Sequence, residues 1–335
     1  MAAIELEGLT KDYGEVLAND DVTFTVERGE VFGYLGPNGA GKTTTIRTLL
    51  GFLSPTAGTV RLLGHEIDAE RDLIEAKRRI GYLPDDPAFD ERATGREVLD
   101  LHASIKGDER SEELLQLFDP PLDRPIREYS QGNVQKLGLV TAFMHEPDLV
   151  ILDEPTNGLD PLLKQRFASF VRDERARGVT IFFSSHVLGE VRRLCDRVGI
   201  IRNGRIVTIE PVEALLDRSG KVVRLKASEP IPVDALDLPG VHDLEVGQHD
   251  GPERETVEAA GNPDETRVET MGGSDGSATV TSSTPDTVDE CTFTFTGNVN
   301  ELLAALSEYQ LQDCSIEEAP LEDVFMRFYG GEEDV

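Results

Sequence analysis

Residues 36–43 constrain this chain more than any other segment, because their sequence GPNGAGKT matches the glycine-rich phosphate loop G-x-x-x-x-G-K-[ST]. The apolar run 31–35 precedes the motif and the helix-like stretch 44–50 follows it, which is the strand–loop–helix context of a nucleotide site. Glycines let backbone N–H groups close around a polyphosphate, and the helix N-terminus attracts the anion. We therefore expect the chain to bind a nucleoside triphosphate. The expected contacts are Gly36, Pro37, Asn38, Gly39, Ala40, Gly41, Lys42, Thr43 and Thr44.

A few residues in and beyond this motif are candidates for the chemistry. Lys42 is expected to reach the β- and γ-phosphates, and the Thr43 hydroxyl is expected to ligate Mg²⁺. The apolar run 148–152 resembles a buried parallel strand and ends in Asp153 and Glu154. In a phosphate-loop ATPase the first acid holds the metal and the second acts as general base. A solvated acidic pair is the alternative, and the upstream phosphate loop disfavours it.

The composition bounds the class of protein. With 335 residues the chain is long enough for two domains, and its formal net charge of −31 argues against a nucleic-acid binder, which would carry basic patches. Its 3 cysteines show no C-x-x-C spacing, so a reducing compartment fits better than a disulfide framework. No apolar stretch approaches the roughly 18 residues that span a bilayer, and the N-terminus shows no signal-peptide pattern. If the protein works at a membrane, other chains are expected to supply the span.

Strand-like and helix-like segments alternate along the first part of the chain, which favours an α/β core. Alternating or wholly apolar runs indicate strands, and amphipathic spacing indicates helices. We expect strands at 3–7, 22–26, 31–35, 148–152 and 179–183, a hairpin at 55–67, and helices at 96–118 and 162–177.

The composition changes after about residue 219. Residues 242–290 are rich in Asp, Glu, Gly, Ser and Thr and poor in large apolar side chains, so we interpret them as a disordered acidic insertion. A solvated loop is favoured there over a regulatory or partner-binding segment. The flanking sequence predicts a small α+β appendage. Its expected elements are paired strands at 221–226 and 291–295, and a helix from Asn298 through Tyr309 with Glu301 completing a capping box.

Further segments make the chain resemble the ATP-binding subunits of ATP-binding cassette (ABC) transporters. Residues 129–137 (YSQGNVQKL) are similar to the L-S-G-G-Q signature, and residues 153–160 (DEPTNGLD) match the Walker B and D-loop motifs. Residues 184–186 (SSH) match the switch-histidine segment. Tyr13 lies where the family stacks an aromatic ring on adenine, although a partly buried turn aromatic is the alternative. The motifs follow the family's order.

The resemblance implies the fold class. It implies an α/β P-loop NTPase of ABC type, in which a RecA-like core carries an antiparallel β subdomain and a helical subdomain at about 86–145. We expect the ATPase domain at 1–218 and the C-terminal α+β accessory domain at 219–335.

The resemblance also implies roles for individual residues. Two ATPase domains pair head to tail in this family, and each signature caps the phosphate loop of the other, so Ser130 and Gly132 would act in trans. An ordinary helix N-cap is a second interpretation of Ser130, and it is compatible with the first. His186 would contact the γ-phosphate and orient the attacking water with Glu154. Asp160 would contact the partner subunit.

Two positions depart from the family pattern. The signature reads S-Q-G-N rather than S-G-G-Q, which keeps polar donors at Gln131 and Asn133. Residues 80–84 (IGYLP) should be followed by glutamine, but Asp85 stands there, as is familiar in the branch that serves ABC-2-type exporters. Because a carboxylate can ligate Mg²⁺ or order water, Asp85 is a candidate metal residue. We expect Asp85→Asn to change coupling or Mg²⁺ dependence more than ATP affinity.

The expected function is an ATP-binding and ATP-hydrolysing subunit that powers an ABC-2-type exporter. Residues 321–327 (LEDVFMR) resemble the ending of such subunits, although a plain amphipathic helix has the same pattern. The expected cofactors are ATP and Mg²⁺. The expected partners are a separate multi-span permease and a second ATPase subunit, identical or different, at the cytoplasmic face of the membrane, without nucleic acid.

Two other functions stay open. A non-transport ABC ATPase of translation or DNA repair is disfavoured by the single cassette and by the acidic charge. A regulatory module without turnover is disfavoured by the complete set of candidate catalytic residues. The sequence names no cargo.

Overall fold

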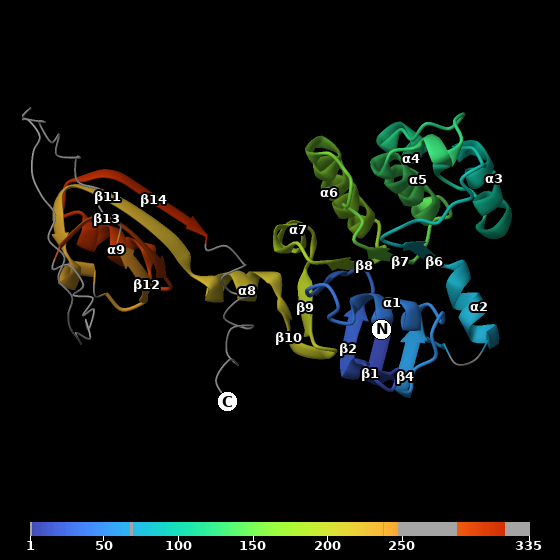
Figure 1. Ribbon diagram of the computed structural model, residues 1–335, viewed down its shortest axis with the longest axis horizontal. Helices are drawn as coiled ribbons and strands as arrows, with labels where there is room; N and C mark the ends of the chain where they lie inside the picture. Colours follow the sequence, from blue (N-terminus) through green and yellow to red (C-terminus); the bar gives the residue numbers. More distant parts are fainter. Residues whose placement is uncertain (1, 68–69, 237, 247–286, 319–335) are drawn as a thin grey trace, which may run out of the picture. The chain divides into compact units, whose positions relative to one another are not determined.

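The computed structural model describes residues 2–67, 70–236, 238–246 and 287–318 (Figure 1). The chain folds into two compact units that divide between Leu216 and Asp217. We call the first the N-terminal unit and the second, residues 217–320, the C-terminal unit. Each has its own hydrophobic core.

A six-stranded sheet in the N-terminal unit brings the predicted motifs to one edge. In spatial order its strands are β10 (Arg205–Pro211), β9 (Arg197–Arg202), β3 (Val31–Leu35), β8 (Thr180–Ser185), β7 (Leu149–Asp153) and β6 (Ile80–Leu83). All are parallel except β10, which pairs antiparallel with β9. β3, β7 and β8 are buried along their whole length, which explains their apolar sequences. Because carboxyl ends of parallel strands share an edge, the segments after β3, β6, β7 and β8 lie together.

A four-stranded antiparallel sheet packs against one face of this sheet. In spatial order its strands are β2 (Leu17–Glu27), β1 (Ala2–Asp12), β4 (Ala57–Leu62) and β5 (His65–Glu66). Leu6 pairs with Phe24 and with Val60, and all three are buried, as the alternation of the sequence requires. The Phe24 ring stacks on Phe32 of β3 with centroids 5.4 Å apart, which ties the two sheets together. The helices α1 (Lys42–Leu49) and α2 (Glu70–Arg78) contribute to the same core.

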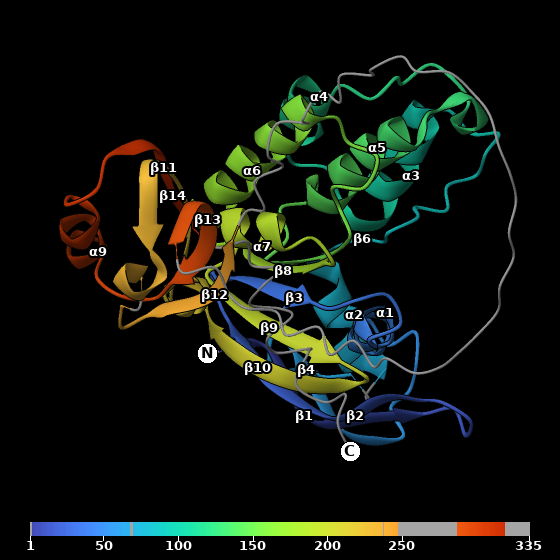
Figure 2. The same cartoon turned by 60° about the vertical axis from the view of Figure 1, so that its left-hand side comes forward.

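Helices pack on the opposite face of the central sheet (Figure 2). The rings of Phe143 and Phe170 meet edge to face at 4.8 Å and join two of these helices. Within the described residues, no helix combines the length and the apolar character that crossing a bilayer requires. The elements are α3 (Gly95–Lys106), α4 (Ser111–Phe118), the 3-10 turn η1 (Ile126–Glu128), α5 (Gln131–Phe143), α6 (Pro161–Ala176), α7 (Leu188–Leu194) and α8 (Val212–Ser219).

The prediction of one helix over residues 96–118 was wrong, because α3 and α4 are separate. Gly107 has a φ of 93° and ends α3, and its N–H donates to the Ala103 carbonyl at 2.8 Å. The Asp108 carboxylate then accepts from the Ser111 N–H at 2.9 Å, at the start of α4. The prediction joined the apolar positions on the two sides of residues 106–113, although these residues contain no large apolar side chain.

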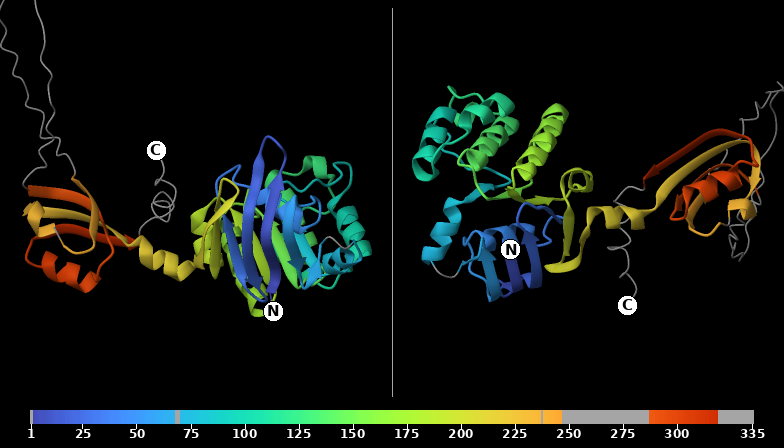
Figure 3. Two further views of the ribbon diagram at one scale, coloured as in Figure 1. Left: turned by 90° about the horizontal axis from the view of Figure 1, so that it is seen from below. Right: turned by 180° about the vertical axis from the view of Figure 1, so that it is seen from behind.

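In its described residues, the C-terminal unit is a four-stranded antiparallel sheet with the helix α9 on it (Figure 3). The predicted pairing of 221–226 with 291–295 is observed, since Leu225 pairs with Cys291. Val223 and Phe293 face the core together with Leu302 of the helix. The elements, with the sheet in spatial order, are β12 (Val241–Val246), β13 (Thr287–Phe295), β11 (Lys221–Pro232) and β14 (Leu311–Glu318), with the 3-10 turn η2 (Val233–Leu236) and α9 (Val299–Leu306).

Two predictions for the C-terminal unit need correction. The limits of the predicted insertion, 242–290, were too wide, because β12 and β13 take up both of its ends. Leu244 and Val288 pack against the core there and stabilise those strands. The α9 helix has the predicted cap, but Asn298 accepts from the Asn300 N–H at 2.9 Å rather than forming a capping box. Residues 247–286 and the predicted 321–327 motif lie outside the described residues.

Candidate active site

The phosphate loop presents the N-terminus of α1. Gly41 is the N-cap of α1, with a φ of 109° and no side chain to cap the helix. A Cβ atom on Gly41 would lie 2.4 Å from the Ala18 carbonyl oxygen. A Cβ atom on Gly36 would lie 2.5 Å from the Ile201 carbonyl oxygen. Only glycine fits at these two positions, so the loop can curl closely around an anion at the helix N-terminus.

The Lys42 side chain folds back over this loop and is buried. Its Nζ donates to the carbonyl oxygens of Gly36, at 2.5 Å, and Pro37, at 3.3 Å. The same Nζ lies 3.6 Å from Oε1 of Glu154. A buried ammonium group at the phosphate loop is well placed to bind phosphate oxygens.

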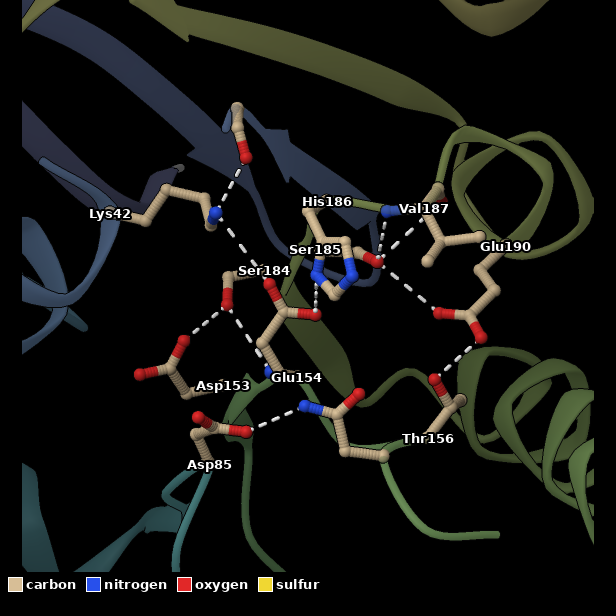
Figure 4. Close-up of polar contacts among 12 residues, drawn as sticks. Lys42, Asp85, Asp153, Glu154, Thr156, Ser184, Ser185, His186, Val187 and Glu190 are labelled. Atoms are coloured by element: carbon tan, nitrogen blue, oxygen red, sulfur yellow. Dashed lines mark hydrogen bonds and ion pairs between the residues drawn. The ribbon is translucent and has the colours of Figure 1, made fainter. Parts of the chain in front are cut away.

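The Glu154 carboxylate joins Lys42 to His186 (Figure 4). Glu154 follows β7 in the left-handed region, with a φ of 48°, and its side chain is 9% exposed. Its Oε2 is 2.9 Å from Nδ1 of His186, while Oε1 faces Lys42. The structure therefore brings the three predicted catalytic residues together, with one buried carboxylate between a cation and an imidazole.

The Asp153 carboxylate is the centre of the predicted metal site. Thr43 Oγ1 donates to it at 3.4 Å and Ser184 Oγ donates at 2.5 Å. Burial raises the pKa of Asp153, and the neighbouring charges of Asp85 and Glu154 raise it further. The hydrogen bond from Ser184 acts in the opposite direction and lowers this pKa. A divalent cation would relieve both the burial cost and this repulsion, so the hydroxyl and the carboxylate fit Mg²⁺. Sequence reasoning missed Ser184, although it is part of the SSH motif.

Asp85 lies after β6 and reaches the same cavity as Thr43 and Asp153. One of its oxygens, Oδ1, accepts a hydrogen bond from Nδ2 of Asn157 at 2.7 Å. The position is compatible with the predicted metal role, which stays a prediction. Asn157, which lies within the D-loop motif, was not predicted as a contact of Asp85.

Lys42, Asp85, Asp153 and Glu154 line a cavity of about 700 Å³ at the carboxyl edge of the sheet. Tyr13 lies at it and is 53% exposed, and Nζ of Lys11 is 5.2 Å from the centre of its ring. An exposed ring at the cavity can stack on a base. Val16, Leu17 and Ala18 of the β1–β2 hairpin also line the cavity, and no motif marked them. The other lining residues are Pro37, Asn38, Gly39, Gly41, Thr43, Thr44, Asn203 and Gly204.

Six predicted residues are not among those that line this cavity: Gly36 and Ala40 of the phosphate loop, His186, and Ser130, Gly132 and Asp160. Ser130 is the N-cap of α5, where its Oγ accepts from the Asn133 N–H at 3.3 Å. Asp160 caps α6, where its carboxylate accepts from the Leu163 N–H at 2.9 Å. A Cβ atom on Gly132 would lie 2.6 Å from the Gly158 carbonyl oxygen. The cap role of Ser130 is therefore observed, and the roles in trans stay predictions.

Glu190 of α7 is a further residue that sequence reasoning missed. Its carboxylate accepts from Thr156 Oγ1 at 2.6 Å, from Lys164 Nζ at 2.9 Å and from Ser185 Oγ at 3.2 Å. Through these bonds the Glu190 side chain contacts the D-loop, α6 and Ser185, which precedes His186. A glutamate four residues after a histidine carries no signal by itself.

The fold and this arrangement of residues define a P-loop nucleotide-binding protein. The profile of the ABC transporter family matches residues 19–157. The chain is 37% identical over 232 residues to the bacitracin transport ATP-binding protein BcrA of Bacillus licheniformis, which covers 68% of this chain and 75% of that protein. It is 34% identical over 288 residues to the Nod factor export ATP-binding protein I of Sinorhizobium fredii, which covers 81% of this chain and 80% of that protein.

A solved structure of an ATP-binding subunit of an ABC transporter aligns with a TM-score of 0.59 and 32% identity, covering 64% of this chain and 92% of that chain. The chain therefore belongs to the family of ABC transporter ATP-binding subunits. The predicted family and the predicted ABC-type fold are confirmed. The export subunits among its relatives agree with the predicted exporter branch.

Proposed function

We propose that this subunit hydrolyses ATP between Lys42, Glu154 and His186 and thereby drives export through a separate permease. The observation that carries the proposal is the position of the Glu154 carboxylate, which lies 3.6 Å from Lys42 Nζ and 2.9 Å from His186 Nδ1. Hydrolysis is the general activity of the family to which the chain belongs. The arrangement supplies a base, a phosphate-binding cation and an orienting imidazole.

Each of the three residues has a separate role. Lys42 binds the terminal phosphates and neutralises charge that develops on them. Glu154 accepts a proton from water as the water oxygen bonds to the γ-phosphorus and the bond to the ADP oxygen breaks. His186 holds the Glu154 carboxylate in orientation through Nδ1. Tyr13 stacks on the adenine.

Thr43, Asp153 and Asp85 are a set of oxygen donors that fits a Mg²⁺ ion. When bound, Mg²⁺ neutralises the β- and γ-phosphate oxygens. Thr43 and Asp153 would hold it, because a hydroxyl and a buried carboxylate there are 3.4 Å apart, and Asp85 lines the same cavity. These are hard oxygen donors of the kind that Mg²⁺ prefers.

A second ATPase subunit completes each site in this proposal. Ser130 and Gly132 lie away from the cavity of their own chain, at the N-terminus of α5, where they are free to cap the phosphates of another subunit. Asp160 is exposed at the start of α6 and contacts that subunit. The two subunits close head to tail at the cytoplasmic face of the membrane and move a multi-span permease, which other chains supply.

The Glu154→Gln variant tests the catalytic assignment. We expect it to bind ATP, to form an ATP-dependent dimer in light scattering, and to hydrolyse ATP about 10²- to 10⁴-fold more slowly. The matched control is Glu229→Gln, which removes one exposed carboxylate from β11 of the C-terminal unit. Hydrolysis at the wild-type rate by Glu154→Gln would show that another group is the base.

A pull-down tests the transport assignment. Tagged Glu154→Gln protein is incubated with ATP and detergent-solubilised membranes of its host, and bound proteins are identified by mass spectrometry. A recurrent multi-span partner, lost with Lys42→Ala, would support the proposal. Recovery of only ribosomal or DNA-repair proteins would favour a non-transport ATPase instead.

A further inference from the structure

A side-chain hydrogen bond joins the loop after β6 to the D-loop (Figure 4). Asn157 Nδ2 donates to Asp85 Oδ1 at 2.7 Å, although the two residues are 72 positions apart in the sequence. Asp85 lines the nucleotide cavity with Thr43 and Asp153, whereas Asn157 does not line it. Asn157 therefore holds a residue of the cavity from outside the cavity.

The backbone of Asn157 is itself anchored. Its N–H donates to the Glu154 carbonyl oxygen at 3.1 Å, within the tight turn that follows β7. The preceding residue, Thr156, is buried and donates to the Glu190 carboxylate at 2.6 Å. The following residue, Gly158, adopts a φ of 73°, which fixes the path of the chain. The amide of Asn157 is thus presented to Asp85 from a constrained segment.

An amide suits this position better than a charged donor. Asp85 is close enough to Asp153 that its charge contributes to the raised pKa of Asp153. An amide N–H donates to the Asp85 carboxylate without adding a cation that would compete with a metal ion. Because Asn157 occupies Oδ1, the second oxygen of Asp85 remains for a metal or a water molecule.

We propose that Asn157 is a positioning residue, which orients the Asp85 carboxylate in the cavity and so sets how tightly the subunit binds Mg·ATP relative to metal-free ATP. This proposal rests on the proposed function, because it requires that ATP binds in this cavity. It assigns no contact with ATP or metal to Asn157, which acts through Asp85. The consequence is that the metal affinity of one site depends on the D-loop of the same chain.

The test compares ATP affinity with Mg²⁺ and with EDTA, measured by titration calorimetry in the Glu154→Gln background. We expect Asn157→Ala to weaken Mg·ATP binding about fivefold, the effect of one typical hydrogen bond, and to leave metal-free ATP binding unchanged. Asp85→Asn should weaken Mg·ATP binding at least as much. The Asp85→Asn/Asn157→Ala double variant should be no weaker than Asp85→Asn, because Asn157 acts only through Asp85.

The outcomes separate this proposal from a purely structural role. The Asp85–Asn157 bond is exposed. The melting temperature of the ligand-free Asn157→Ala variant should therefore equal that of its parent, the Glu154→Gln protein. A lowered melting temperature, unchanged Mg·ATP affinity, or a double variant weaker than Asp85→Asn would each overturn the proposal. If the parent protein itself failed to bind ATP, the proposed function would be wrong instead.

Discussion

In the N-terminal unit Lys42, Asp153 and Glu154 are buried side by side, whereas no charged residue described in the C-terminal unit is buried. On its sheet the exposed Arg224 of β11 pairs with Glu317 of β14 at 3.0 Å. Among the described residues of the C-terminal unit, only Thr294 is both polar and buried. Burying charge costs free energy unless each group finds a partner, so a protein keeps buried charges mainly where function or a matched pair requires them.

The N-terminal unit also buries charge where no catalysis is proposed. Arg110, before α4, donates through Nη1 and Nη2 to both oxygens of Glu174 of α6, at 2.8 and 2.9 Å. Both side chains are almost fully buried. This bidentate pair links α4 to α6, so the contrast between the units also concerns how helices are held together.

Breaking the Arg110–Glu174 pair should give the largest loss of stability. Arg110→Met leaves Glu174 buried with only the exposed Arg177 at 3.5 Å, so we expect the free energy of unfolding to fall by about 3 kcal/mol. Denaturant unfolding followed by circular dichroism measures it. The Arg110→Met/Glu174→Leu variant should recover most of the loss, because it removes both charges. A single variant as stable as the wild type would show that the pair contributes nothing.

Lower pH should destabilise the N-terminal unit through His145. Burial, with Lys106 nearby, lowers the pKa of this histidine to about 4 from its ordinary 6.5, so the folded protein keeps it neutral. The unfolded chain then binds more protons below pH 6.5, and stability falls as the pH drops from 7 to 5. The expected loss is about 2 kcal/mol. Unfolding of wild type and His145→Gln at both pH values measures it, and an equal pH dependence in the two proteins would count against the assignment.

The smallest effect is expected on the exposed face of the C-terminal unit. Arg224→Met removes a solvent-exposed ion pair, so the free energy of unfolding should change by less than about 0.5 kcal/mol. Thermal unfolding of the full chain, at low and high salt, measures it. A loss comparable to that of Arg110→Met would show that the two units do not differ in the way described above.

Much of the site could be predicted because its residues are adjacent in the sequence. The phosphate loop, the Asp153–Glu154 pair and the SSH motif each lie at or just after the carboxyl end of a strand, and parallel strands bring these ends together. Contacts between side chains could not be predicted in the same way. The Asp85–Asn157 and Arg110–Glu174 bonds join residues 72 and 64 positions apart, and a single sequence shows no pattern for such pairs.

The positions of helices, strands and loops were predicted with different accuracy, because the apolar patterns on which the predictions rest differ in clarity. The α6 and β8 elements lie close to their predicted positions because their apolar patterns have one clear period. The break at Gly107 was missed because the prediction joined two apolar segments across residues 106–113, which hold this glycine and no large apolar side chain. The ends of the predicted insertion were misplaced because only a few apolar residues, such as Leu244 and Val288, hold those strands to the core.

The sequence by itself determined which chemical groups this protein has for ATP, because the phosphate loop and its companion acids are local motifs with fixed backbone geometry. The tertiary structure alone decided how those groups are paired: Glu154 lies between Lys42 and His186, and Asp85 is bonded to Asn157. Such pairings depend on how helices and loops pack across the sheet edge. Packing sums many weak contacts over the whole chain, so no local run of residues encodes it.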